Sequence, residues 1–244
     1  MGKYYKEDLA YIHDVGYRDF ALKSATGILE ILDRNDIRGG LVVDLGCGSG
    51  LWAEQLFKAG YEVLGIDISG AMIEIARRRV PGARFKVGSL YKARIPSCAA
   101  VTSLGECLNY LFDPERDSRA MALLFGRVYD ALSPGGVFIF DILEPGQIAP
   151  GSISRTFSEG KDWLVLVEKE EDPGLKKLTR RIVSLRKAGK HYRRSDEMHE
   201  VRLYSSTDVA RELRRAGFRV RKMTSYGGYD LGRAHAAFLA RKPE

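Results

Sequence analysis

The sequence predicts an α/β protein with a mostly parallel sheet, and three observations support this prediction. Residues 41–45 form an apolar run typical of a buried strand, interrupted by one carboxylate, Asp44. The run leads directly into a glycine-rich loop, and the loop leads into a helical pattern at residues 51–56. Strand and helix patterns then alternate as far as residue 141, the order that produces parallel sheets with helical crossovers.

Composition narrows the class of protein. The 244 residues suffice for one α/β domain with an insertion, and 45% hydrophobic residues exclude a disordered chain. The net charge of +7 favours anionic partners. No apolar run approaches the ~20 residues of a membrane span, and the N-terminus lacks a signal-peptide core. The three cysteines lack disulfide or zinc spacing, so we expect reduced thiols, no metal site and a cytoplasmic protein.

The glycine-rich loop after the first strand indicates a nucleotide-type cradle. Gly46, Gly48 and Gly50 are spaced two apart, and glycine permits positive φ and close approach of a ligand to the main chain. The helix beyond the loop offers free N–H groups and the positive end of its dipole. A dinucleotide fingerprint requires a glycine at position 51, where this chain has Leu51, so an oxidoreductase is disfavoured.

Residues 42–50 read Val-Val-Asp-Leu-Gly-Cys-Gly-Ser-Gly, which resembles the first motif of the class I (Rossmann-like) S-adenosylmethionine-dependent methyltransferases at every defined position. Residues 132–136 also match the Leu-x-Pro-Gly-Gly that this family commonly has before its fifth strand. The resemblance implies S-adenosylmethionine as cofactor and one methyltransferase domain over residues 1–244. It also implies a doubly wound, mostly parallel seven-stranded sheet that ends in an antiparallel C-terminal hairpin.

Residues 1–40 are predicted to be mostly helical, because apolar residues repeat three and four apart in the second half of this segment. Related methyltransferases use an N-terminal helix to close over the cofactor, so we expect a helical cap here. The resemblance implies that Tyr11, and less directly Tyr17 or Arg18, lies near the methionine end of the cofactor. Packing of Tyr11 on the core is the alternative.

The second strand is predicted at residues 62–66 and leads to Asp67. An acidic residue about 20 positions after the glycine loop grips the ribose diol in Rossmann-type sites. One carboxylate has acceptor lone pairs for both hydroxyl groups, so Asp67 is expected to take this role. Ser69 is predicted to cap the next helix, which contains Met72.

The third strand is predicted at residues 84–87, and the chain departs from the family pattern just after it. Many family members have an Asp that contacts adenine where this chain has Ser89. The departure leaves adenine recognition to the hydroxyl and backbone groups of Ser89 and Leu90.

The fourth strand is predicted at residues 99–104, and the residues after it are expected to face the transferred methyl group. This follows because ligands of parallel sheets bind beyond the carboxyl ends of the strands. Glu106 and Asn109 lie three apart on one face of a helical turn, and with Tyr110 they are predicted to bind the acceptor. The alternative is that Glu106 is a helix-start carboxylate and Asn109 a surface amide.

The resemblance and these strand ends together predict the site. The expected cofactor-binding residues are Tyr11, Asp44, Gly46, Cys47, Gly48, Gly50, Asp67, Ile68, Met72, Ser89, Leu90, Leu104 and Gly105. A general base is needed only if the acceptor arrives protonated. The predicted candidates for that role are Glu106, His13 and His199, with His191 also considered.

A change in composition follows the fifth strand, which is predicted at residues 137–141 after a helix at 118–132. Residues 150–204 give extended runs at 163–167, 179–185 and 198–204, separated by turn signals. We call residues 150–204 the flap and expect an inserted antiparallel lid over the site. Its many Lys and Arg residues indicate either solvated strand faces or a surface for an anionic substrate or RNA.

The C-terminal part is predicted to contain a helix that begins at Ser206 and is capped by Gly217, followed by strands at 218–226 and 234–240. The leading functional prediction is methyl transfer to a small-molecule acceptor, with an anionic acceptor favoured by the net charge. Two alternatives stay open: methylation of a tRNA or rRNA base, and a non-catalytic protein that binds S-adenosylmethionine. No membrane partner is expected.

Overall fold

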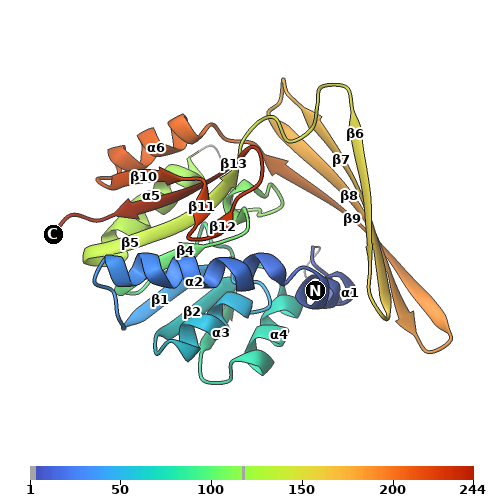
Figure 1. The fold of residues 1–244 in the computed structure, drawn as a ribbon, viewed down its shortest axis with the longest axis horizontal. Coiled ribbons are helices and arrows are strands. Elements are labelled where there is room, and N and C mark those ends of the chain that lie inside the picture. Colours follow the sequence, from blue (N-terminus) through green and yellow to red (C-terminus); the bar gives the residue numbers. More distant parts are fainter. Residues whose placement is uncertain (1–3, 117–118) are drawn as a thin grey trace.

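The computed structural model describes residues 4–116 and 119–244, and a seven-stranded sheet with helices on both faces forms its body (Figure 1). The strands of this sheet are β1 (Leu41–Leu45), β2 (Glu62–Asp67), β3 (Arg84–Val87), β4 (Cys98–Ser103), β5 (Leu132–Leu143), β10 (Arg219–Met223) and β13 (His235–Arg241).

The strand order is β10-β13-β5-β4-β1-β2-β3. Strands β1 to β5 pair in parallel, and β13 is antiparallel to both β5 and β10. The predicted fold class is therefore confirmed. The strand order reverses between β1 and β4, and ligands of such sheets bind beyond the carboxyl ends of the strands at this point.

Two apolar cores separate the sheet from its helices. On one face lie α2 (Asp19–Arg34), α3 (Leu51–Lys58) and α4 (Gly70–Arg79), whose buried side chains include Trp52 and Ile73. On the other face lie α5 (Ala120–Ala131) and α6 (Ser206–Arg215), which bury Phe125 and Leu213. Helix α4 begins at the predicted cap, because the Ser69 hydroxyl accepts a hydrogen bond from the backbone N–H of Met72 at 3.2 Å. Within the described residues, no helix is long and apolar enough to span a membrane.

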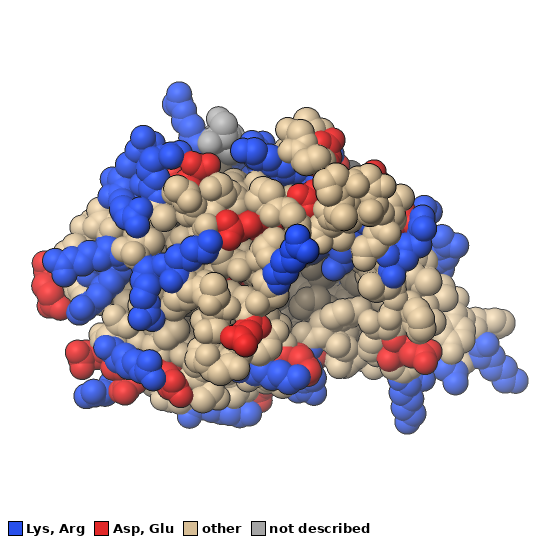
Figure 2. All heavy atoms as spheres, turned by 45° about the horizontal axis from the view of Figure 1, so that its top comes forward, with Lys and Arg blue, Asp and Glu red and all other residues tan. Residues whose placement is uncertain are grey.

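The flap forms a separate four-stranded antiparallel sheet that extends away from the body (Figure 1). Its strands are β6 (Ile153–Glu159), β7 (Trp163–Asp172), β8 (Lys177–Ala188) and β9 (His191–Arg202). Three shorter strands were predicted; β6 has mostly exposed residues and no apolar alternation, so its sequence carried no signal. On the face drawn in Figure 2, Lys and Arg side chains lie among Asp and Glu side chains.

The observed elements differ from the sequence prediction at three places. Strand β5 already begins at Leu132, so the Pro-Gly-Gly segment lies within the strand rather than in a turn before it. A two-stranded hairpin, β11 (Ser225–Tyr226) and β12 (Tyr229–Asp230), lies between the two C-terminal strands. Helix α5 begins at Ala120, while its predicted start at residue 118 lies outside the described residues.

Helix α1 (Glu7–Gly16) lies between the flap and the body (Figure 1). Its buried residues Leu9 and Ile12 pack with Trp163 of the flap. The segment before the helix is held by Glu197 of β9, whose carboxylate accepts the backbone N–H groups of Tyr5 at 2.8 Å and of the next residue at 3.0 Å. The N-terminal segment therefore closes the space between the two sheets.

Candidate active site

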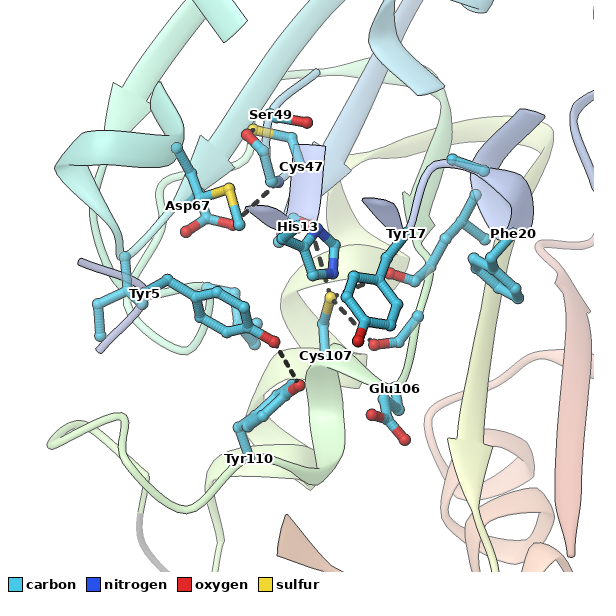
Figure 3. A pocket seen from close by; sticks show the side chains of 18 of the residues that line it. Tyr5, His13, Tyr17, Phe20, Cys47, Ser49, Asp67, Glu106, Cys107 and Tyr110 are labelled. Atoms are coloured by element: carbon cyan, nitrogen blue, oxygen red, sulfur yellow. Dashed lines mark hydrogen bonds between the residues drawn. The ribbon is translucent and has the colours of Figure 1, made fainter. Parts of the chain in front are cut away.

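A cavity of about 540 Å³ lies where the carboxyl ends of the parallel strands meet the flap and the N-terminal segment (Figure 3). This volume is typical of small-molecule sites. One end is lined by the glycine loop and the residues that follow β2 and β3. The other end is lined by flap side chains that include Val165, Lys169, Arg180 and Ile182.

The three loop glycines all have positive φ, at +77° for Gly46, +51° for Gly48 and +79° for Gly50. A Cβ on Gly46 would collide with Cys107, and one on Gly50 would come within 3.0 Å of Ala76. A Cβ on Gly48 would meet no atom within 4 Å, because Gly48 faces the open space of the cavity. Packing therefore requires Gly46 and Gly50, whereas the open space at Gly48 is available to a ligand.

Asp67 is half-buried at the end of β2 and lines the cavity beside this loop. Its Oδ2 accepts the N–H of Gly48 at 2.9 Å, and its Oδ1 accepts the N–H of Ser69 at 2.8 Å. Burial raises the pKa of the carboxyl, and the two backbone donors oppose that shift. Each oxygen keeps a second lone pair, so the side chain can still accept two ligand hydroxyl groups.

Asp44 lies deeper, at 2% exposure, and also lines the cavity. Its Oδ1 accepts the Thr102 hydroxyl at 2.7 Å, and the indole N–H of Trp52 donates to that hydroxyl at 3.1 Å. Burial raises the pKa of the Asp44 carboxyl to about 7. A cationic ligand above this residue would stabilise its charged form.

The loop after β4 is held by a fully buried carboxylate, Asp141 of β5. Gly105 and Glu106 both have positive φ, at +80° and +58°, and their N–H groups donate to Asp141 at 2.9 and 2.7 Å. Positive φ is rare for a residue with a side chain and persists only where the surroundings impose it. Asp141 also accepts the Tyr226 hydroxyl at 3.2 Å and Nε2 of His235 at 2.8 Å.

The Glu106 carboxylate points into the cavity and forms a two-pronged ion pair with Arg180 of β8, one contact being 2.8 Å between Nη2 and Oε2. Nη1 of Arg180 also lies 3.4 Å from the Tyr110 hydroxyl. That hydroxyl is 2.8 Å from the hydroxyl of Tyr5, and Figure 3 shows the two groups directed at each other. Body, flap and N-terminal segment thus form one continuous wall.

Most predicted site residues meet in this cavity. Those in its lining are His13, Asp44, Gly46, Cys47, Gly48, Asp67, Ile68, Met72, Leu90, Leu104, Gly105, Glu106 and Tyr110, together with the less directly implied Tyr17. Those outside the lining are Tyr11, Gly50, Ser89, Asn109, His191 and His199.

Three of the residues outside the lining have structural partners. The Tyr11 hydroxyl donates to Asp162 at 3.1 Å, so its ring lies between α1 and the flap. Asn109 is fully buried; its amide N–H groups donate to the carbonyls of Leu143 and Arg202, which leaves no N–H for an acceptor. His199 is fully buried against Glu197.

At the predicted adenine end, Ser89 donates to Asp113 at 2.7 Å, and it is Asp113 that lines the cavity. A carboxylate therefore occupies the region where the family pattern placed one, although it comes from a different position in the sequence. Sequence reasoning also missed Tyr5, Phe20, Gln147, Lys169, Arg180 and His235 as lining residues. Phe20, Arg180 and His235 lie within elements that were predicted, but no local pattern indicates which face of an element meets the cavity. Gln147 and Lys169 lie outside the predicted elements.

Residues 42–136 match a family model described as a methyltransferase domain. This match and the observed sheet topology support a class I S-adenosylmethionine-dependent methyltransferase. This methyltransferase is similar to the dTDP-3-amino-3,4,6-trideoxy-alpha-D-glucopyranose N,N-dimethyltransferase of Streptomyces venezuelae, with 24% identity over 231 residues. The aligned region covers 88% of this chain and 92% of the relative.

Two solved structures are similar to this methyltransferase in fold. One is an S-adenosylmethionine-dependent methyltransferase from Clostridium acetobutylicum ATCC 824, with a TM-score of 0.81, 21% identity and coverage of 96% of this chain and 98% of the other. The second is S-adenosylmethionine-bound CalS10, an amino pentose methyltransferase from Micromonospora echinaspora. Its TM-score is 0.77 at 17% identity, with coverage of 95% and 96%.

The methyl donor of this enzyme is S-adenosylmethionine, and the donor end of the cavity fits it. The open space at Gly48 admits a ligand against the main chain, and Asp67 retains acceptor capacity for a ribose diol. Asp44 can balance positive charge on a bound sulfonium compound. The assignment of individual residues to the donor is a prediction that three variants test.

We expect Asp44→Asn to gain stability relative to wild type as pH rises. The raised pKa means that the folded state holds the proton more tightly than the unfolded state, so this stabilisation is present below the unfolded value of 3.8 and is lost as pH rises through about 7. Between pH 5 and pH 8 the free energy of unfolding of the variant should gain about 2–3 kcal/mol on wild type. Urea unfolding at several pH values measures this, with the exposed Asp130→Asn as control. A pH-independent difference would contradict the buried ionisation.

We expect Gly48→Ala to weaken S-adenosylmethionine binding at least about tenfold, because the new methyl group would enter the ligand space. Gly60→Ala is a matched control: Gly60 also has positive φ, at +90°, and open space around its Cβ, but it lies outside the cavity lining. Calorimetric titration of both variants separates ligand contact from backbone strain. Equal affinity in the two would show that no ligand approaches Gly48.

We expect Asp67→Ala to weaken S-adenosylmethionine binding by at least about 1.4 kcal/mol, which is tenfold, since hydrogen bonds to a charged acceptor are lost. Asp67→Asn keeps one accepting oxygen and should lose less. Calorimetry gives both affinities, and thermal unfolding checks that the loop of Gly48 stays folded. An unchanged dissociation constant for Asp67→Ala would remove this residue from the donor site.

Proposed function

We propose that this enzyme transfers the methyl group of S-adenosylmethionine to a small-molecule acceptor that carries a negatively charged group. The observation that supports this most directly is Lys169, a half-buried cation at the flap end of the cavity. In this proposal residues 1–40 contribute the cap, and the flap at residues 150–204 serves as the lid over the acceptor.

Lys169 lies on β7 directly opposite Arg180 of β8 in the strand register. The charge of Arg180 is balanced by the ion pair with Glu106. No described residue forms a hydrogen bond or ion pair with the Lys169 ammonium group. Burial lowers the pKa of Lys169, and the charge of Arg180 lowers it further. An anionic group on the acceptor would compensate this charge.

The rest of the acceptor end is largely apolar, with Phe20, Val165, Val167 and Ile182 in the lining. Apolar walls with few placed polar groups are typical of small-molecule sites. The relatives support a small-molecule acceptor. The Streptomyces venezuelae relative is named for a dTDP-linked amino sugar, and CalS10 for an amino pentose.

An RNA acceptor is less well supported, because many basic residues of the flap are already paired. Arg186 and Arg193 both donate to Asp8 of α1. Lys177 pairs with Glu200, and Arg194 with a neighbouring aspartate, at 2.7 and 2.9 Å. Figure 2 shows acidic side chains among the basic ones on the face it presents. Paired cations give less counterion release on RNA binding.

The enclosed geometry accounts for how the enzyme would work. Bound S-adenosylmethionine supplies an electrophilic methyl group, and its leaving sulfur needs no proton. The walls from Tyr5, Tyr110 and the flap exclude water from the reacting atoms. Alignment of the acceptor atom with the methyl group can account for roughly 7–11 kcal/mol of the barrier.

The test uses S-adenosylmethionine labelled in its methyl group and cell extract separated into RNA, anion-exchanger-bound small molecules and unbound small molecules. We expect label in the anion-exchanger-bound fraction. Lys169→Met should reduce its labelling about 10–100-fold, because a hydrogen bond to a charged group contributes about 1.5–3 kcal/mol. Lys187→Met, on the same sheet but outside the cavity lining, should label normally. Label in RNA, or equal rates for both variants, would contradict the proposal.

A further inference from the structure

His235 and Asp141 form a pair at the acceptor end of the cavity that the proposed function does not yet use. His235 begins β13 and lines the cavity, while Asp141 is fully buried on the neighbouring strand β5. Nε2 of His235 lies 2.8 Å from Oδ1 of Asp141. The imidazole stacks on Phe20 with ring centroids 6.4 Å apart, and Phe20 lies beside Gly105 at the end of β4. The pair therefore lies where the methyl group is expected to be transferred.

The hydrogen bond fixes the protonation pattern of the ring. Asp141 receives two backbone N–H groups and the Tyr226 hydroxyl, so its carboxylate acts as an acceptor. Nε2 of His235 must therefore carry the hydrogen, and in the neutral ring Nδ1 is then the basic nitrogen. No described residue forms a hydrogen bond with Nδ1, and the side chain is 16% exposed.

We propose, resting on the proposed function, that His235 accepts the proton of an amine or hydroxyl acceptor and that Asp141 positions its ring. The N–H or O–H proton of the acceptor moves to Nδ1 of His235. The electron pair of the acceptor nitrogen or oxygen forms the new bond to the methyl carbon. The carbon–sulfur bond breaks with its pair left on sulfur, so the sulfonium charge disappears and the imidazolium gains it. The product is an N- or O-methylated small molecule, with a neutral thioether as the second product.

The charges around the ring suit this role. Three charged groups act on the imidazole electrostatically: Asp141 on β5, Glu106 after β4 and Arg180 on β8. Tyr226 acts only indirectly, because its hydroxyl donates a hydrogen bond to Asp141. Burial alone would disfavour the imidazolium, but the hydrogen bond and charge of Asp141 outweigh burial and raise the pKa of His235. A base with a raised pKa holds the abstracted proton more firmly.

His13 is the competing base, and the structure distinguishes the two histidines. His13 also lines the cavity, from the cap helix α1, but no described residue forms a hydrogen bond with its ring. Burial lowers the pKa of His13 below the ordinary value of 6.5, whereas the pKa of His235 is raised above it. A rate limited by His235 should therefore rise with pH above 6.5, and one limited by His13 should rise below it.

The test compares His235→Gln, His235→Ala and His13→Gln with wild type on the fraction that accepts label. The glutamine amide can still donate to Asp141 but has no basic nitrogen, so His235→Gln should keep the fold and lose at least about 100-fold in rate. The wild-type rate should rise with pH above 6.5, and this rise should be absent in His235→Gln. Added imidazole should restore His235→Ala several-fold, and it should not affect His191→Ala at the exposed start of β9.

A second measurement does not depend on turnover. Nitrogen NMR of the free protein should show His235 protonated at Nε2 when neutral, with a titration midpoint above that of His13. A wild-type rate unchanged in His235→Gln, or an NMR spectrum with the proton on Nδ1, would overturn the assignment. Label in RNA would overturn only the proposed acceptor class, because the same imidazole comparison on that fraction still tests the proton transfer.

Discussion

The buried carboxylate of Asp141 is the constraint on which the acceptor side depends. It receives the N–H groups of Gly105 and Glu106, a tyrosine hydroxyl and an imidazole, and so joins four segments of the chain. Without the Asp141 carboxylate, Gly105 and Glu106, two successive residues with positive φ, would be left with unpaired, partly buried N–H groups. The strained loop directs Glu106 toward Arg180, and that ion pair links the body to the flap.

The donor side is built differently, from contacts that are local in sequence. Its glycine loop follows one strand, and its key carboxylate, Asp67, ends the neighbouring strand. The strand alternation and the motif at residues 42–50 were therefore enough to predict the parallel sheet and to bring the glycine loop and Asp67 together at its edge. The cap of α4 by Ser69 followed from the same local rules.

The acceptor side could not be predicted in the same way, because its partners are far apart in sequence. Glu106 and Arg180 are separated by 74 positions, and Asp141 and His235 by 94. A strand pattern indicates which residues alternate, but not which sheet face meets a cavity. Ser89 shows the limit of motif reasoning: the expected carboxylate is supplied from position 113 through a side-chain contact. The exposed strand β6 lacked an apolar pattern altogether.

The position of Asp44 beneath the glycine loop has a consequence for ligand binding itself. Since its carboxyl has a pKa of about 7, a substantial fraction of free enzyme molecules carries a proton there at neutral pH. A positively charged ligand favours the ionised form, so association is coupled to release of that proton into the buffer. The measured heat of association then includes the ionisation heat of the buffer. The number of protons released per ligand bound reports how far the ligand lowers the pKa of Asp44.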